Sequence, residues 1–214
     1  AYNGIILMML VNYLNENFIT LEELASVTKI DQQEIRAYQT EKLMPLASYK
    51  LDVALNCSSF TGAHSENYVM EYYAKGYISW LSTAHTLKSE ERVFEEFSNR
   101  YSRALSVLKG SKCEVATPGL NEIIMEDWEH FLQGTYGLCT QTGLPEDIAA
   151  KGFAVEQIKA LLERDVLDSN EIKRLEYFVN LLDNASSPFA PHERLNSSRH
   201  RLVNEVRRKY KLQS

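Results

Sequence analysis

Two helix starts lie close together near the N-terminus and constrain the local fold more than any other feature. Thr20 is followed three residues later by Glu23, and Asp31 by Glu34, which is the spacing of a capping box. We therefore expect two short helices that begin about eleven residues apart and are joined by a tight turn. The apolar residues between and within them share one face: Leu21, Leu24, Ala25, Ile30, Ile35 and Tyr38. Since Pro45 ends the second helix, the segment predicts a helix-turn-helix, and nucleic-acid recognition is the first hypothesis to test.

The order of residues in this segment resembles the helix-turn-helix of the MerR family. The matching residues are Thr20-Leu21, Glu23-Leu24-Ala25, Ile35-Arg36 with Tyr38, and Leu43-Met44-Pro45. The resemblance covers about thirty residues. It implies that the second helix contacts DNA, with Gln32, Gln33, Arg36 and Lys50 as the expected contacts.

The charge of the same segment disfavours DNA as a partner. Asp31 and Glu34 stand where a reading helix usually offers basic or amide side chains. The basic wing that follows in the MerR pattern is reduced to Ser48, Tyr49 and Lys50. Residues 1–50 contain four basic and six acidic residues, whereas nonspecific DNA affinity depends on lysine and arginine releasing counterions. A helical scaffold, or a surface for another protein, is the alternative.

The remaining periodicity predicts a mainly α-helical chain. Residues 49–63 alternate and leave room for one short strand or hairpin, and residues 65–87 have the spacing of a long aromatic helix that serves as core or as a stacking surface. Helical spacing also marks residues 93–108, 121–133, 148–162, 169–182 and 202–210, and residues 134–145 form a glycine-punctuated loop. We therefore expect a helix-turn-helix-like module at 1–63 and a helical domain at 64–214.

The composition is that of an ordinary globular protein with an uneven charge. Hydrophobic residues make up 44% of the 214 residues and the formal net charge is -6. Residues 192–211 nevertheless contain seven basic residues and only two acidic ones. Two interpretations follow: a basic final helix docked on an acidic body, or a site for a phosphate or nucleotide.

Cysteine content and hydropathy indicate the cellular compartment in which we expect the protein. Cys57, Cys113 and Cys139 are odd in number and far apart, which favours a reducing compartment, and we expect a cytoplasmic protein. The apolar run at residues 5–14 is too short to span a bilayer, so we expect no membrane partner. Cys57 and His64 lack the second ligand pair that a zinc site requires, so no metal site is expected.

The polar turn after residue 128 is the place where chemistry is most plausible. Residues 128–140, with the later segments 187–194 and 197–199, resemble an uncharacterised bacterial family of unknown function that is often labelled as a natural-product biosynthesis protein. The resemblance implies a shared fold and a biosynthetic gene neighbourhood, with no assigned reaction. From the residues themselves, His130 is the candidate general base and Cys139 the candidate nucleophile, if the fold brings them together. The alternative is that these side chains pack a turn.

Ligand contacts are expected at two places. Beside the polar turn they are Trp128, Tyr136 and Thr140, and before the last helix they are His192, Arg194 and Arg199, which can hold an anion if the arginines converge. If the arginines do not converge, they are ordinary salt-bridge partners.

The sequence favours a noncatalytic, ligand-responsive regulator or accessory binding protein. No glycine-rich phosphate loop or dinucleotide fingerprint is present, and the cofactor is unknown. A small molecule, a protein partner or a second copy are the expected partners, with DNA disfavoured. The alternative is a small-molecule biosynthetic enzyme that uses the His130, Tyr136 and Cys139 region.

Overall fold

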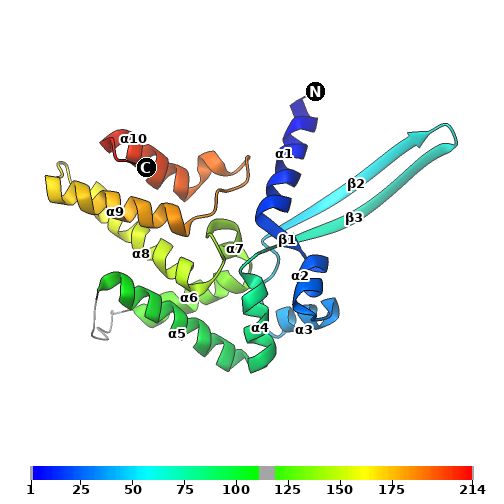
Figure 1. The fold of residues 1–214 in the computed structure, drawn as a ribbon, viewed down its shortest axis with the longest axis horizontal. Coiled ribbons are helices and arrows are strands. Elements are labelled where there is room, and N and C mark those ends of the chain that lie inside the picture. Colours follow the sequence, from blue (N-terminus) through cyan, green and yellow to red (C-terminus); the bar gives the residue numbers. More distant parts are fainter. Residues whose placement is uncertain (1, 111–118, 214) are drawn as a thin grey trace.

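A computed structural model describes residues 2–110 and 119–213, with side chains from Met9 onward, and the chain is mainly α-helical with one small sheet (Figure 1). The α-helices are α1 (Tyr2–Asn17), α2 (Leu21–Thr28), α3 (Gln32–Thr40), α4 (Tyr77–Leu87), α5 (Glu90–Lys109), α6 (Leu120–Leu132), α7 (Thr135–Cys139), α8 (Pro145–Leu162), α9 (Ser169–Ala185) and α10 (Glu205–Tyr210). The strands are β1 (Phe18–Thr20), β2 (Tyr49–Ser59) and β3 (Gly62–Ala74). A 3-10 turn, η1 (Arg194–Asn196), and a π-helical turn, η2 (His200–Asn204), precede α10.

The sheet is antiparallel with the strand order β1-β3-β2. Phe18 pairs with Ala74, and Tyr49 pairs with Tyr72 at the base of a long hairpin whose strands stay in register to Ser59 and Gly62. Beyond this base, the hairpin of β2 and β3 projects from the body as an arm (Figure 1). At its tip the Phe60 side chain is fully exposed.

The hairpin corrects two predictions. Residues 65–74 belong to a strand and not to a long aromatic helix, and the helix begins only at Tyr77, after Gly76. The strands are also much longer than the short hairpin that the alternation at 49–63 indicated. Tyrosine and valine suit a strand when a partner is available, and β2 supplies that partner along its whole length. The predicted boundary at 63/64 falls within β3, and the division into two domains stays a prediction.

The two short helices near the N-terminus are capped in different ways. The first capping box is confirmed: Thr20 Oγ1 accepts a hydrogen bond from the Glu23 amide at 3.2 Å, and Glu23 accepts one from the Thr20 amide at 2.8 Å. The second is wrong, because Asp31 accepts from the Gln33 amide at 2.7 Å while Glu34 does not reach back. The carboxylate of Glu34 instead accepts a hydrogen bond from the Tyr38 hydroxyl and lies 3.2 Å from His85 Nδ1 on α4.

The amphipathic helices of the second half are confirmed, with one addition. The helices expected at 93–108, 148–162 and 169–182 are α5, α8 and α9. The segment 134–145, expected as a loop, contains α7, which begins after Gly134 with its positive φ of 78°. The final helix is interrupted by the π-helical turn η2.

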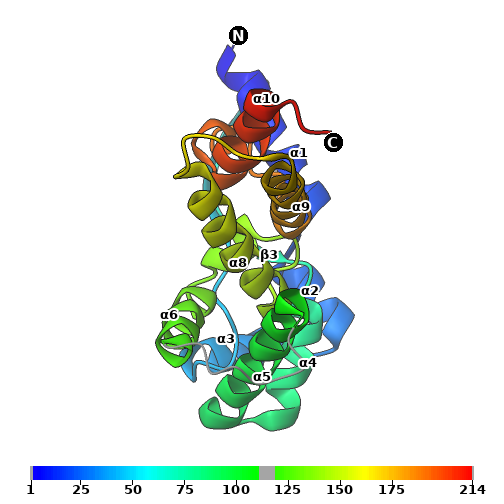
Figure 2. The same ribbon diagram turned by 90° about the vertical axis from the view of Figure 1, so that its left-hand side faces the viewer.

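Aromatic side chains form the main core where α4, α5 and α6 meet. Trp80 of α4 contacts Phe131 of α6 with ring centroids 4.8 Å apart, and Phe97 of α5 contacts Trp128 of α6 at 5.2 Å. The aromatic residues of 77–81 are therefore core, as the sequence allowed. A second core joins α8 and α9 to α10, and Figure 2 shows these three helices together above α4 and α5.

A third, smaller core ties the two ends of the chain together. It contains Tyr13, Leu14 and Phe18 near the N-terminus, Tyr72 of β3, and Ala190 from the segment after α9. In the part of the chain that the structure describes, no helix combines the length and apolar character needed to cross a lipid bilayer.

A candidate ligand cleft between the two ends of the chain

Three cavities that share lining residues lie between the end of α1 and the segment at 187–204. The first has a volume of about 280 Å³ and the second about 380 Å³, and they share Tyr13, Glu16, Asn17 and Pro188. The third, of about 320 Å³, shares Pro188 and Arg194 with the second. We call these three cavities the junction cleft. Its size range suits a small organic molecule.

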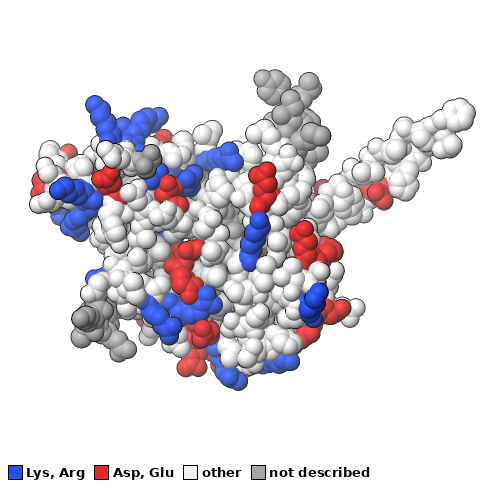
Figure 3. Space-filling model, in the orientation of Figure 1, with Lys and Arg blue, Asp and Glu red and all other residues white. Residues whose placement is uncertain are grey.

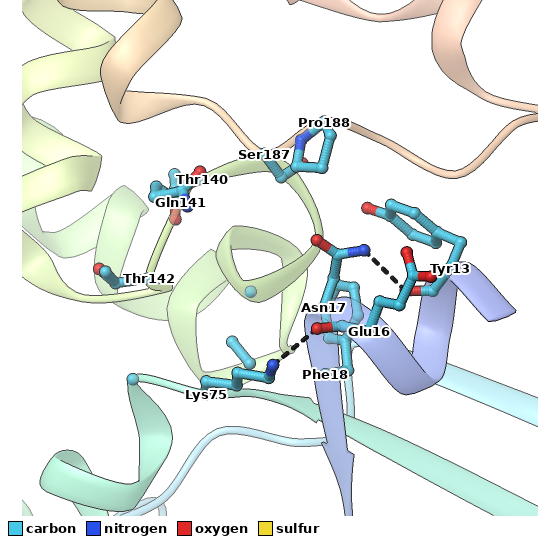
Figure 4. A pocket seen from close by; sticks show the side chains of 13 residues that line it. Tyr13, Glu16, Asn17, Phe18, Lys75, Thr140, Gln141, Thr142, Ser187 and Pro188 are labelled. Carbon is cyan, nitrogen blue, oxygen red and sulfur yellow. Dashed lines mark hydrogen bonds between the residues drawn. The ribbon is translucent and has the colours of Figure 1, made fainter.

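The first cavity lies where several elements meet (Figure 4). Its lining residues are Tyr13, Glu16, Asn17 and Phe18 from α1 and β1, Ala74, Lys75 and Gly76 at the end of β3, Gly137, Thr140, Gln141 and Thr142 from α7 and the turn after it, and Ser187 and Pro188 after α9.

Hydrogen bonds hold the walls of this cavity in place. Lys75 Nζ donates to the Glu16 carbonyl at 2.6 Å, and Asn17 Nδ2 donates to the Tyr13 carbonyl at 2.8 Å (Figure 4). On the opposite wall, the buried Thr140 donates to the Tyr136 carbonyl at 2.6 Å. The cleft is therefore shaped by contacts within the protein before any ligand enters.

One buried hydroxyl at the first two cavities lacks a hydrogen-bond partner. The Tyr13 side chain is 5% exposed, and its hydroxyl lies near Tyr49 and Ser187 without a hydrogen bond of good geometry to any described residue. Burial raises the pKa of Tyr13, so the group stays a neutral donor at neutral pH. An unpaired buried hydroxyl costs about 1–3 kcal/mol, and a polar ligand or water atom in the cleft would remove that cost.

The third cavity is lined by basic side chains. It contains Arg194, Arg199 and His200, together with Ser197 and Asn204. Arg194 uses Nε to donate to the Phe189 carbonyl at 3.0 Å, and Arg199 uses Nε and Nη2 on the carboxylate of Asp183 at 2.8 and 2.5 Å. Further N–H groups of both guanidinium groups make no hydrogen bond to the described protein, and they can serve an anion.

Asp183 explains why part of the basic cluster is not free. Arg207 also donates to Asp183, at 2.7 Å, and to Asn180 at 2.8 Å. Burial alone would raise the pKa of Asp183, but hydrogen bonds from Arg207 and Arg199 outweigh it and lower that pKa. Arg207 and Arg199 are therefore salt-bridge partners of Asp183, and Arg194 and Arg199 also line a cavity, where a phosphate or nucleotide site stays a prediction.

A hydrogen bond joins this basic region to the hairpin. The Tyr49 hydroxyl, at the start of β2, donates to Glu193 Oε2 at 2.6 Å. Burial and the bond to Glu193 raise the pKa of Tyr49. Because Glu193 directly precedes Arg194, a ligand held by Arg194 lies one residue from a contact with the hairpin base.

The candidate catalytic pair is not joined. His130 is exposed on α6, where its ring meets Tyr136 edge-on with centroids 6.3 Å apart. Cys139 is half-buried at the end of α7, and its carbonyl accepts from Lys151 Nζ at 2.5 Å. No hydrogen bond links His130 to Cys139 in the described ranges, and their catalytic roles stay a prediction.

The other predicted ligand residues divide between cleft and interior. Thr140 lines the first cavity, whereas Trp128 is a core residue whose ring stacks on Phe131 at 5.5 Å. Tyr136 donates its hydroxyl hydrogen to the half-buried carboxylate of Asp127, a residue that the sequence did not single out. His192 is exposed, with 3.8 Å between its Nε2 and Glu193 Oε1, and it does not line the cleft.

The residues expected to contact DNA lie on the surface, but one of them, Arg36, forms an ion pair within the protein. Gln32, Gln33 and Lys50 are exposed. Arg36 makes an ion pair with Glu71 of β3, with 2.5 Å between Nη2 and Oε2. Figure 3 shows little charge along the projecting hairpin, whereas blue side chains lie over the α9 and α10 end of the molecule and also around α5 and α4. No basic surface accompanies α3 in this view.

No metal centre is formed by the residues that the structure describes. Cys57 and His64 lie opposite each other across the hairpin. Among the described side chains, however, no three of the histidine, cysteine, aspartate and glutamate type lie close enough together to hold a metal ion.

Comparison with known proteins gives one match. Residues 93–211 match the model of a family described as a family of unknown function (DUF6058). No curated protein and no solved structure matches the chain. The matched range begins within α5 and contains α6 to α10, including Arg194 and Arg199 of the cleft, whereas Tyr13 and the hairpin lie outside it.

Proposed function

The chain belongs to this family of unknown function, and we propose that it is a noncatalytic, ligand-responsive binding protein whose junction cleft holds a small molecule with an anionic group. The observation that carries the proposal is the convergence of Arg194 and Arg199 on one cavity. A neighbouring cavity shares Pro188 and Arg194 with it and is lined by Tyr13, whose hydroxyl has no hydrogen bond to a described residue. An anionic head and a polar body are the two ligand features that these groups would recognise.

A carboxylate or phosphate suits the basic end of the cleft. The guanidinium groups of Arg194 and Arg199 offer N–H donors in a planar geometry that matches either anion, and His200 adds a ring nitrogen. Asp183 balances only part of this positive charge, since Arg207 also binds it. The other end, where Tyr13 and Asn17 lie beside the charged residues Glu16 and Lys75, would accept a polar group of the same molecule.

A response to the ligand would pass through the contact between Tyr49 and Glu193. The ligand and the hairpin base both act on the short segment that contains Glu193 and Arg194, because these two residues are adjacent in the chain. A ligand changes a conformational equilibrium only by binding one state better than the other. We infer that the ligand-bound state is the one with Arg194 turned into the cleft and the hairpin base held by Glu193.

The output surface would be the N-terminal module. Its two short helices α2 and α3, followed by the hairpin, have the order of a helix-turn-helix with a wing, which agrees with the MerR resemblance. The weakly charged hairpin and the engaged Arg36 favour a protein partner over DNA. A role beside natural-product biosynthesis enzymes would fit such an accessory protein. The enzyme alternative has less support, since no hydrogen bond joins His130 to Cys139 among the described residues.

The test uses inorganic phosphate as the probe and the thermal unfolding midpoint as the readout. Phosphate should raise the midpoint of the native chain and of Arg201→Ala, because Arg201 is exposed and lines none of the three cavities. Arg194→Ala should lose most of that shift. Equal shifts in the two variants would show that phosphate binds elsewhere. Native mass spectrometry of protein purified from its own host would then identify the physiological ligand.

A further inference from the structure

A separate groove lies between the start of α5 and the second half of α6, away from the junction cleft. Its volume is about 610 Å³, and its apolar floor consists of Phe94, Met125 and Trp128. Trp128 is 5% exposed and is held by Phe94 and Phe97, whereas Met125 is 60% exposed. The floor thus combines a fixed aromatic surface with a flexible thioether that can adapt to a partner.

Four carboxylates line the rim of this groove. They belong to Glu90, Glu91, Glu126 and Glu129. Lys42 is the cation nearest to them in the ion pairs of the described residues, 3.6 Å from Glu90, and both side chains of that pair are about half exposed. Glu91 is held by the Ser89 hydroxyl at 2.6 Å, which lowers the pKa of Glu91 and keeps it charged. The groove therefore presents an apolar floor inside a negative rim.

We propose that this acidic groove binds a basic amphipathic helix of a partner protein. Two antiparallel helices with an apolar seam are the usual receptor for the apolar face of a third helix. Lysine and arginine on the flanks of that helix can lay their methylene stems over Met125 and bring their charges to the glutamates. The complementary charges would also orient the partner and speed its association.

The composition of the groove excludes the other obvious occupants. A helix with acidic or neutral flanks would remove water from the four glutamates without supplying a counter-charge, which is unfavourable. A second copy of this chain offers a basic segment in α10, but the apolar residues Val203 and Val206 beside it are buried in its own core. That segment would bring charge to the groove without an apolar face. The occupant is therefore a different protein.

The test uses the full chain and a fluorescently labelled 18-residue helical peptide built only of leucine and lysine, with fluorescence anisotropy as the readout. Two further peptides replace every lysine by glutamate or every leucine by serine. We expect the leucine-lysine peptide to bind at least about ten times more tightly than either, and the affinity to fall with added salt because part of the attraction is electrostatic. Absence of binding by the leucine-lysine peptide overturns the proposal, as does equal binding of the serine peptide.

Matched variants place the site. The double variant Glu126→Lys, Glu129→Lys should weaken binding at least about tenfold, whereas Glu163→Lys, Asp165→Lys, with the same change of net charge on exposed residues at the end of α8, should stay within about twofold. Met125→Ala changes the floor without changing charge and should also weaken binding. Equal losses in both charge-reversal variants, or none with Met125→Ala, would overturn the proposal. Concentration-dependent self-association that Glu126→Lys, Glu129→Lys abolishes would assign the groove to a second copy instead.

Discussion

Tyr136 of α7 donates its hydroxyl hydrogen to the carboxylate of Asp127 on α6, within the range that matches the family model. Burial raises the pKa of Asp127, and the hydrogen bonds from Tyr136 and Tyr101 only partly offset this effect. The carboxyl group is therefore easier to protonate in the folded chain than in the unfolded chain. Its contribution to stability decreases as pH rises from its unfolded pKa of about 3.9 to the raised folded value.

Asp127→Asn should remove that loss, because an amide oxygen can still accept from Tyr136 without carrying a charge. The free energy of unfolding of this variant, relative to the native chain, should be higher at pH 7 than at pH 4. Urea denaturation at both pH values measures the difference. Asp165→Asn, on an exposed residue, is the control and should show no such change. A relative stability that falls between pH 4 and pH 7 would contradict the assignment.

Asp183→Asn should have the opposite pH dependence. Arg207 and Arg199 hold the folded pKa of Asp183 below its usual value despite burial, so its stabilisation is complete above the unfolded pKa and is lost as pH falls through the folded pKa. At pH 7 the variant should lose about 1–3 kcal/mol, since two partly buried arginines lose a charged partner. The deficit should shrink below about pH 4. Glu205→Gln, whose partners lie 3.7 and 3.8 Å away on a more exposed surface, should cost less than about 1 kcal/mol.

Gly134→Ala should be far more damaging than Gly110→Ala. Both glycines have positive φ, 78° and 66°, and alanine at either position incurs about 1 kcal/mol of backbone strain. A Cβ at Gly134 would also lie 2.6 Å from the Leu46 carbonyl oxygen and 2.7 Å from that of Ala47, whereas the space around Gly110 is open. We expect a loss above about 3 kcal/mol for Gly134→Ala. Denaturation curves that give equal losses would show that the backbone near Leu46 moves aside.

Shortening the hairpin should leave the fold intact. Replacing residues 53–68 by an Asn-Gly turn that joins Asp52 to Val69 keeps the pairs at the base of the sheet. The removed part contains exposed apolar side chains, including Leu55, Phe60 and Tyr68, and buries little surface against the body. The free energy of unfolding should therefore change by less than about 1 kcal/mol. A larger decrease in the free energy of unfolding, measured by chemical denaturation, would mean that the hairpin stabilises the rest of the protein.

The sequence alone determined the features that depend on neighbours along the chain. The Thr20 capping box and the helices α5, α8 and α9 follow from local hydrogen bonds and from apolar residues that recur at helical spacing, so nearby residues suffice to predict them. The arginines of the cleft were also identified by their clustering and charge. These predictions did not depend on which helices and strands pack against each other.

Only the tertiary structure decided the features that depend on distant partners. Tyr68 to Tyr73 have a spacing that suits either a helix or a strand, and pairing with β2 selects the strand. Glu34 does not form the predicted capping box, because its carboxylate contacts Tyr38 on the same helix and His85 of α4, which is distant in the sequence. Tyr13 gave no signal within an apolar run, yet it faces the same cleft as Pro188. Long-range contacts determine which side chains share a cavity, and for this reason the junction cleft and the acidic groove emerge only once the chain is folded.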